Sequence, residues 1–226
     1  MTSLRTPFVL FLVVTAFAAG PEERKGKGGK GAETPKGAID LVAAAKPANN
    51  PFPAFTLTSP VVKDGGTLPV EFTGDGGGVS PPLAWSNLPK GTASLALVMH
   101  HLDPEGNTKV YWLVTGINPQ TSQAAKDAKD FGQLGVSTVH DRVEYAPPHS
   151  KGPGLKKYVL PLFALSAKPS FADPAKPVTI ETLLPAIKGK VLGAADLTVT
   201  YTRAPGGANE EAKGPPRKGP PAGKGE

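Results

Sequence analysis

The chain has 226 residues, a length that suits one large domain or two small ones. It holds 27 glycines and 26 prolines but no cysteine, which excludes disulfide bonds, thiolate metal sites and a cysteine nucleophile. The formal net charge is +6, and half of this excess lies in two terminal segments of mixed sign, 21–37 and 204–226. Because aromatic residues are absent from these segments, we expect solvated spacers and no nucleic-acid partner.

The first 18 residues have the pattern of a secretory signal peptide. Arg5 supplies a positive charge, and Phe8–Phe17 is an apolar run too short to cross a bilayer comfortably. Ala16–Ala18 has the small-x-small form of a cleavage site. We therefore predict a signal peptide over 1–18 and an exported protein, periplasmic or secreted, with an uncleaved membrane anchor as the alternative. No cysteine follows the run, so we expect no lipoprotein anchor.

Composition divides the remaining chain into three parts. Residues 19–50 and 204–226 are rich in glycine, lysine and proline, and we predict a disordered linker and a disordered tail because they bury too little apolar surface to offset ordering entropy. Within the linker, Ile39–Ala45 is a short apolar stretch compatible with a helical turn or a strand. The compact domain is predicted over 51–203, about the commonest single-domain size.

The domain reads as mostly β, with short strands between turns, which favours a sandwich. Two prolines restrict where their strands can lie in a sheet. Pro69 suits an edge strand or the first position of a strand, and Pro161 predicts a bulge or an edge strand because it has no N–H to donate to a neighbouring strand. Alternating or continuous apolar patterns predict strands over 55–59, 68–73, 83–85, 94–99, 111–115, 157–165 and 195–203.

Two long loops and one helix complete the domain. Residues 123–141 are polar and dotted with glycine, which predicts a surface loop. Gly74–Pro82 is irregular, and its three consecutive glycines either bring backbone amides close to a ligand or form a flexible loop without one. The helix is predicted over Thr179–Gly189, with Thr179 as N-cap, an apolar face of leucines and isoleucine, and glycine as the stop.

Most of the chemically useful side chains fall in the stretch Leu95–Thr115. His100 and His101 end its first strand, so their rings point to opposite faces and do not jointly bind one metal ion. Asp103 and Glu105 flank Pro104 and read either as turn residues or as a carboxylate pair.

The sequence offers nothing positive for catalysis. It has no Gly-x-Ser-x-Gly elbow and no His-Glu-x-x-His motif. We therefore predict a protein that is not an enzyme and has no catalytic residue, metal or cofactor. Lys151, Lys156 and Lys157 surround a glycine-proline loop, where they either bind an anion together with backbone amides or are ordinary surface charges.

Several segments together resemble the phosphatidylethanolamine-binding protein family, in its bacterial Raf-kinase-inhibitor-like branch. The similarity covers about 51–203. The segments, in the order of the family, are Asp75-Gly-Gly-Gly-Val-Ser-Pro-Pro-Leu-Ala-Trp85, Asp103-Pro-Glu-Gly-Asn107, Tyr111-Trp-Leu-Val114 with Ile117-Asn-Pro119, Tyr145–Tyr158 with Phe163-Ala-Leu165, and Leu183–Tyr201.

This resemblance implies a central antiparallel β-sandwich with a few short peripheral helices. It also implies a small pocket at one end that binds phosphate or phospholipid headgroups. Tyr111 and Lys156 stand where the family has pocket histidines, and His100 and His101 are expected at the rim. The ligand-binding positions it implies are Asp103, Glu105, Tyr111, Pro148, His149, Lys156 and Tyr158.

The leading hypothesis is an exported, non-enzymatic binding protein with a small anionic or phospholipid-like ligand. The alternative is a secreted inhibitor or scaffold of the same fold that acts on a peptidase or a kinase-like protein partner. Peripheral contact with a membrane is compatible with both. A hydrolase is the least favoured reading.

Overall fold

The computed structural model describes Leu41 and residues 55–149 and 154–203. The predicted signal peptide, almost all of the linker and the tail lie outside the described residues. Among those described, no helix is long and apolar enough to cross a membrane. The strands are β1 (Thr56–Thr58), β2 (Leu83–Ser86), β3 (Ser94–Leu102), β4 (Thr108–Ile117), β5 (Gln123–Ala124), β6 (Gln133–Leu134), β7 (Val136–Ser137), β8 (Arg142–Val143), β9 (Lys156–Leu165) and β10 (Val191–Tyr201). A 3-10 helix, η1 (Val70–Phe72), and an α-helix, α2 (Ile180–Ile187), accompany them.

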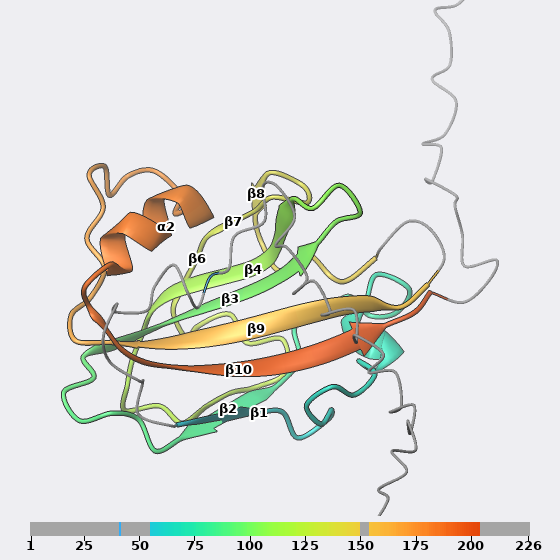
Figure 1. Ribbon diagram of the computed structural model, residues 1–226, viewed down its shortest axis with the longest axis horizontal. Coiled ribbons are helices and arrows are strands. Elements are labelled where there is room, and N and C mark those ends of the chain that lie inside the picture. Colours follow the sequence, from blue (N-terminus) through green and yellow to red (C-terminus); the bar gives the residue numbers. More distant parts are fainter. Residues whose placement is uncertain (1–40, 42–54, 150–153, 204–226) are drawn as a thin grey trace, which may run out of the picture. The chain divides into compact units, whose positions relative to one another are not determined.

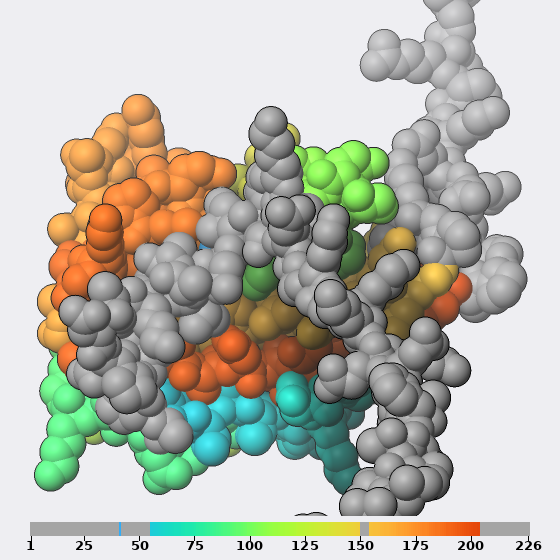
Figure 2. Space-filling view, viewed as in Figure 1, coloured from blue at the N-terminus to red at the C-terminus, as the bar shows by residue number. Residues whose placement is uncertain are grey.

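The strands form antiparallel sheets, as expected. The central sheet has the order β10-β9-β3-β4-β6, and a smaller sheet has the order β1-β2-β5. β7 and β8 pair with each other. Figure 1 shows α2 on one side of the central sheet and β1 with β2 on the other. In the space-filling view the red-orange surface of β10 borders the cyan surface of the β1 region (Figure 2).

Two apolar clusters bury the two faces of the central sheet. One lies between the sheets and includes Leu57, Trp85 and Leu97. The other lies under α2 and includes Val98, Phe163 and Leu183. Burial on both faces explains why β3 and β4 read as nearly continuous apolar runs rather than as alternating ones.

Leu41 belongs to the cluster under α2, although we assigned its segment to the linker. Its side chain is 1% exposed. It shares the cluster with Ile180 and Leu183 of the helix and Val98 of the sheet. The core therefore includes a residue that lies ahead of the predicted start of the domain.

The predicted strand over 68–73 is wrong. Pro69 has φ −58° and precedes the 3-10 turn of η1. The amide of Phe72 donates to the carbonyl oxygen of Pro69 at 3.0 Å, and the Thr73 hydroxyl donates to the carbonyl oxygen of Val70 at 2.9 Å. Proline fixes a φ that suits this turn, and the short local bonds replace a ladder. Just ahead of the turn, Thr67 forms an isolated bridge with Thr200, and the Leu68 amide donates to the carbonyl oxygen of Thr200 at 2.8 Å.

Pro161 was expected at a bulge or an edge, but β9 is an inner strand. Its pairing with β10 continues through Asp196 opposite Pro161. On the β3 side the paired residues stop at Leu162 and resume, in the same register, at Val159. The missing N–H of the proline thus interrupts one ladder locally without shifting it.

The polar segment 123–141 was expected as one loop. It contains the short strands β5, β6 and β7, because it runs along the edges of both larger sheets. The expected helix is present as α2. Thr179 accepts a hydrogen bond from the amide of Thr182, the Thr182 hydroxyl accepts one from the amide of Thr179, and Gly189 follows with φ 75°.

Candidate functional site

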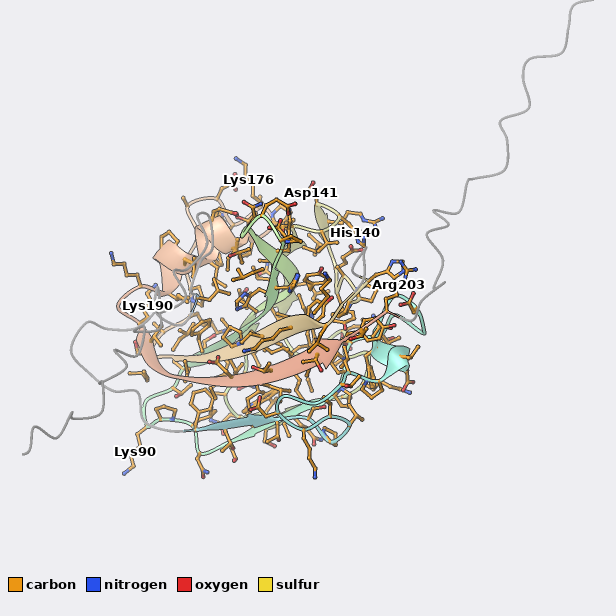
Figure 3. The ribbon with its side chains drawn as sticks, turned by 45° about the vertical axis from the view of Figure 1, so that its right-hand side comes forward. Lys90, His140, Asp141, Lys176, Lys190 and Arg203 are labelled. Atoms are coloured by element: carbon orange, nitrogen blue, oxygen red, sulfur yellow. The ribbon has the colours of Figure 1, made fainter. Side chains whose placement is uncertain are left out.

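A pocket of about 500 Å³ opens where β3 ends and where β4 and β9 begin. Its walls come from four separate parts of the chain, including the turn between β7 and β8. Figure 3 shows His140 of that turn at the same end of the central sheet as Arg203, which follows β10. The lining residues are His101, Asp103, Pro104, Lys109, Tyr111, Thr138, Val139, His140, Pro147, His149 and Lys156.

Asp103 is held by the tight turn that joins β3 to β4. The Asn107 amide donates to its Oδ1 at 2.7 Å, and the Asn107 side chain donates to its Oδ2 at 3.1 Å. The Lys109 ammonium lies 3.6 Å from the same Oδ2. Desolvation opposes ionisation, but the Asn107 hydrogen bonds and the Lys109 charge outweigh it and lower the pKa of Asp103 below its usual value. The group is therefore a carboxylate at neutral pH.

Tyr111 occupies a β-bulge. Met99 pairs with Trp112 and His100 pairs with Val110, so Tyr111 is the extra residue of β4. Because of the bulge, the side chains of Tyr111 and Trp112 both join the cluster between the sheets, although the two residues are neighbours in sequence. Tyr111 is 6% exposed and forms part of the pocket wall.

Tyr158 lies under the pocket rather than in its wall. Its ring meets the Tyr111 ring edge to face with centroids 5.1 Å apart, and the His101 ring with centroids 5.2 Å apart. Its hydroxyl is buried, and no partner of standard hydrogen-bond geometry lies near it among the described residues. Burial and the adjacent Tyr111 phenol raise the pKa of Tyr158, and burial likewise raises the pKa of Tyr111. Both phenols stay protonated, and the phenol of Tyr111 belongs to the pocket wall.

The two predicted rim histidines separate as the strand pleat requires. His101 enters the pocket wall, and its Nδ1 lies 2.9 Å from the carbonyl oxygen of Lys157. His100 does not line the pocket; it pairs with Val110 on one side and Val159 on the other.

Two more histidines in the wall each pair with a carboxylate outside it. His140 Nδ1 lies 2.5 Å from Glu144, which also faces Arg142 at 3.6 Å. His149 Nε2 lies 3.2 Å from Asp75 Oδ1. Lys156 lines the pocket as well, and no carboxylate lies within 4.0 Å of its ammonium in the part of the chain that the structure describes.

Asp75 connects this wall to the end of β10. Its Oδ2 accepts from the Tyr201 hydroxyl at 2.6 Å, and its Oδ1 accepts from Arg203 Nε at 3.0 Å. The loop that carries Asp75 packs closely against the backbone of η1, because a Cβ at Gly76 would lie 2.1 Å from the carbonyl oxygen of Val70. These glycines permit close backbone packing, and a ligand is not needed to explain them.

The predicted site is assembled in part. Asp103, Tyr111, His149 and Lys156 all line the pocket, and Tyr158 lies beneath it. Glu105 is exposed and does not line it. Pro148 is buried, with its carbonyl oxygen accepting from the Gly74 amide at 3.0 Å, and Lys151 lies outside the described residues.

Sequence reasoning missed several lining residues, among them Lys109, Thr138, His140 and Pro147. Lys109 lies two residues before Tyr111, a spacing that places both side chains on one face of a strand. This spacing was the one sequence signal that could have identified Lys109 as a pocket residue. Thr138 and His140 lie in the segment 123–141, which was read as a surface loop and gave no local sign of a shared wall. Pro147 directly precedes Pro148, which the family resemblance had implied.

A larger hollow of about 690 Å³ lies beside α2, with Phe171, Pro177 and Pro185 among its lining residues. The described residues that line it include no histidine or tyrosine. The smaller pocket gathers three histidines, two lysines and a desolvated phenol, so we assign the candidate site there.

The fold and the pocket define an antiparallel β-sandwich with a cavity at one end of its central sheet, lined by histidines, lysines and one carboxylate. A family model described as phosphatidylethanolamine-binding protein matches residues 58–202. The chain belongs to the phosphatidylethanolamine-binding protein family, as its motifs suggested.

Individual relatives agree with this assignment. A Mycobacterium tuberculosis protein provisionally named as a lipoprotein, LppC, is 36% identical over 168 residues, covering 71% of this chain and 80% of the relative. A homologue of known structure from Chlamydia trachomatis is 29% identical, with a TM-score of 0.62, covering 67% of this chain and 99% of that one. The crystal structure of Escherichia coli YbcL, at 22% identity, TM-score 0.59 and coverage of 66% and 99%, shares the fold.

Proposed function

We propose that this protein is an exported, non-enzymatic binding protein whose pocket holds a small phosphate-like anion. The observation that carries the proposal is the position of Lys156. Its ammonium lines the pocket and has no carboxylate partner among the described residues, whereas the lining carboxylate, Asp103, is engaged by Asn107 and Lys109.

The surrounding groups suit an oxyanion. Tyr111 presents a protonated phenol, and Lys109 adds a second ammonium in the same wall. A phosphate accepts several charge-assisted hydrogen bonds, and lysine binds it as a point charge. The pocket volume is in the range of small-ligand sites.

Replacing Lys156 tests this assignment directly. Lys156→Ala should weaken the binding of inorganic phosphate, measured by isothermal titration calorimetry, by about tenfold, because a charge-assisted bond is removed from a partly desolvated wall. Lys157→Ala is the matched control, since Lys157 is exposed, adjacent, and absent from the pocket wall. Equal affinities for the two variants would remove the role given to Lys156.

Binding without turnover is part of the proposal. The Tyr111 phenol in the wall and the Tyr158 phenol beneath it have raised pKa values and supply no base at neutral pH. Release of phosphate from any member of a panel of phosphate esters, abolished by Lys156→Ala, would show instead that the site is catalytic.

Export is supported by the N-terminal signal pattern and by the lipoprotein name of the mycobacterial relative. This chain contains no cysteine, so a lipidated cysteine does not anchor it. Mass spectrometry of the protein from an envelope fraction should find a chain shortened by the signal peptide. A full-length cytoplasmic product would contradict export. The inhibitor or scaffold alternative stays a prediction.

A further inference from the structure

We propose that the pocket selects a phosphomonoester or free phosphate that carries no amine, and disfavours a zwitterionic phosphoethanolamine head, because Lys109 already occupies the carboxylate that an amine would need. This inference rests on the proposed anion site and specifies its ligand class.

A carboxylate or an open aromatic face holds a bound ammonium group more strongly than neutral oxygen acceptors do. The described wall contains one carboxylate, Asp103. Glu105, two residues further on, is exposed and outside the pocket. Tyr111 is 6% exposed and its ring packs edge to face against Tyr158, so it offers little free face.

Asp103 is engaged on both oxygens. Oδ1 accepts from the Asn107 amide at 2.7 Å, and Oδ2 accepts from the Asn107 side chain at 3.1 Å and faces the Lys109 ammonium at 3.6 Å. The Asp103 side chain is 15% exposed and the Lys109 side chain 43%, so water screens this contact in part. An incoming ammonium must either displace Lys109 or lie beside it, and in the second case two like charges come close together.

The carboxylates just behind the wall are engaged as well. Asp75 accepts from Tyr201 and Arg203 and faces His149. Glu144 faces His140 and Arg142. Among the described residues, the pocket therefore offers Lys156 for an anion and no comparable group for a cation.

Two ligands that differ only in the amine make the comparison sharp. Calorimetry of the full chain at pH 7.5 should give an affinity for ethyl phosphate at least about threefold above that for phosphoethanolamine, the size expected for a partly exposed charge contact. Equal affinities, or tighter binding of phosphoethanolamine, would overturn the selectivity while leaving the anion site intact. Failure of inorganic phosphate, ethyl phosphate and phosphoethanolamine alike would overturn the proposed function itself.

Lys109→Met separates the role of Lys109 from a general loss of charge. Removing the ammonium frees Asp103, so the ratio of the two affinities should shift toward phosphoethanolamine by about threefold to fivefold, even as ethyl phosphate binding weakens. Lys157→Met, outside the pocket, should leave the ratio unchanged. If Lys109→Met does not fold, Lys109→Gln replaces it in the same measurement. An unchanged ratio of the two affinities in the folded variant would contradict the proposal.

The same phosphate chemistry is available from lipid or from solution. Glycerol phosphate and phosphatidylcholine vesicles doped with phosphatidic acid distinguish the sources. Co-sedimentation with doped vesicles, lost in Lys156→Ala, supports a lipid source; binding of glycerol phosphate alone supports a soluble one. If the protein co-sediments equally well with vesicles that contain phosphatidylethanolamine instead of phosphatidic acid, the proposed selection against an amine is contradicted.

Discussion

Asp75 is the residue that ties the candidate pocket to the rest of the fold. It lies in a glycine-rich loop, yet its carboxylate accepts from Tyr201 and Arg203 at the far end of the chain and faces His149 in the pocket wall. Desolvation raises its pKa, but the Tyr201 hydrogen bond and the Arg203 and His149 charges outweigh this and lower the pKa of Asp75.

A lowered pKa in the folded protein makes stability depend on pH in one direction. The unfolded chain binds the proton more tightly, so the ionised Asp75 stabilises the fold above pH 3.8, its ordinary pKa, and loses this effect as the pH falls through the lower folded value. Asp75→Asn should therefore lower the free energy of unfolding by about 1–2 kcal/mol at pH 7. Urea denaturation across pH 2–7 would measure it.

The difference between Asp75→Asn and the unmodified protein should shrink toward zero at the acid end of that series. Asp130→Asn, at an exposed position, provides a control that should leave stability nearly unchanged. A difference that grows as the pH falls would show that the carboxylate is not held in its ionised form.

Tyr111 shows what a residue pattern misses. Strand alternation places Tyr111 and Trp112 on opposite faces, but the bulge brings both into the cluster between the sheets. The extra residue in the register turns Tyr111 toward Tyr158 and makes it part of the pocket wall. A bulge depends on the register of two paired strands, and so no single strand sequence reveals it.

At the scale of elements, those with strong local signals form where expected. α2 follows its capping residue Thr179, buries Ile180, Leu183 and Ile187, and ends before Gly189. Leu184, expected on the apolar face, is only partly buried. η1 replaces an expected strand because Pro69 has a φ of −58°, which suits the turn, and short-range hydrogen bonds satisfy the backbone there.

The cap of α2 offers a test at this scale. Thr179→Ala removes the acceptor for the Thr182 amide and should lower the unfolding free energy by about 1 kcal/mol, because a first-turn donor loses its partner. Chemical denaturation would measure the loss. Thr179→Ser keeps the hydroxyl and should restore most of the stability; equal losses in both variants would mean that the cap is not the cause.

For the whole molecule, the decisive feature is that the central sheet is buried on both faces. The smaller sheet covers one face, and α2 with Leu41 covers part of the other. Leu41 is 1% exposed, although it precedes the first strand and lies in the predicted linker. The compact unit therefore depends on the chain ahead of residue 51.

Leu41→Ala should destabilise the protein by about 2–5 kcal/mol, because it removes a buried side chain and leaves a cavity against the helix and the sheet. Thermal unfolding of the full chain would measure the change. Leu155→Ala is the matched control, since Leu155 is 68% exposed and should alter stability little. Similar melting temperatures for the two variants would place Leu41 outside the energetic core.

The sequence by itself determined the β class, the four long strands of the central sheet, the helix and the family, because these follow from local periodicity, capping residues and short motifs. It also nominated Asp103, Tyr111 and Lys156. Only the tertiary structure decided that the Lys109 ammonium pairs with the Asp103 carboxylate and that Glu105 lies outside the pocket. It also decided that Lys156 lines the same pocket as histidines from distant segments. The reason is physical: strand register, a bulge and the order of strands in the sheet bring these groups together, and those quantities are set by pairing between segments rather than by the residues within one.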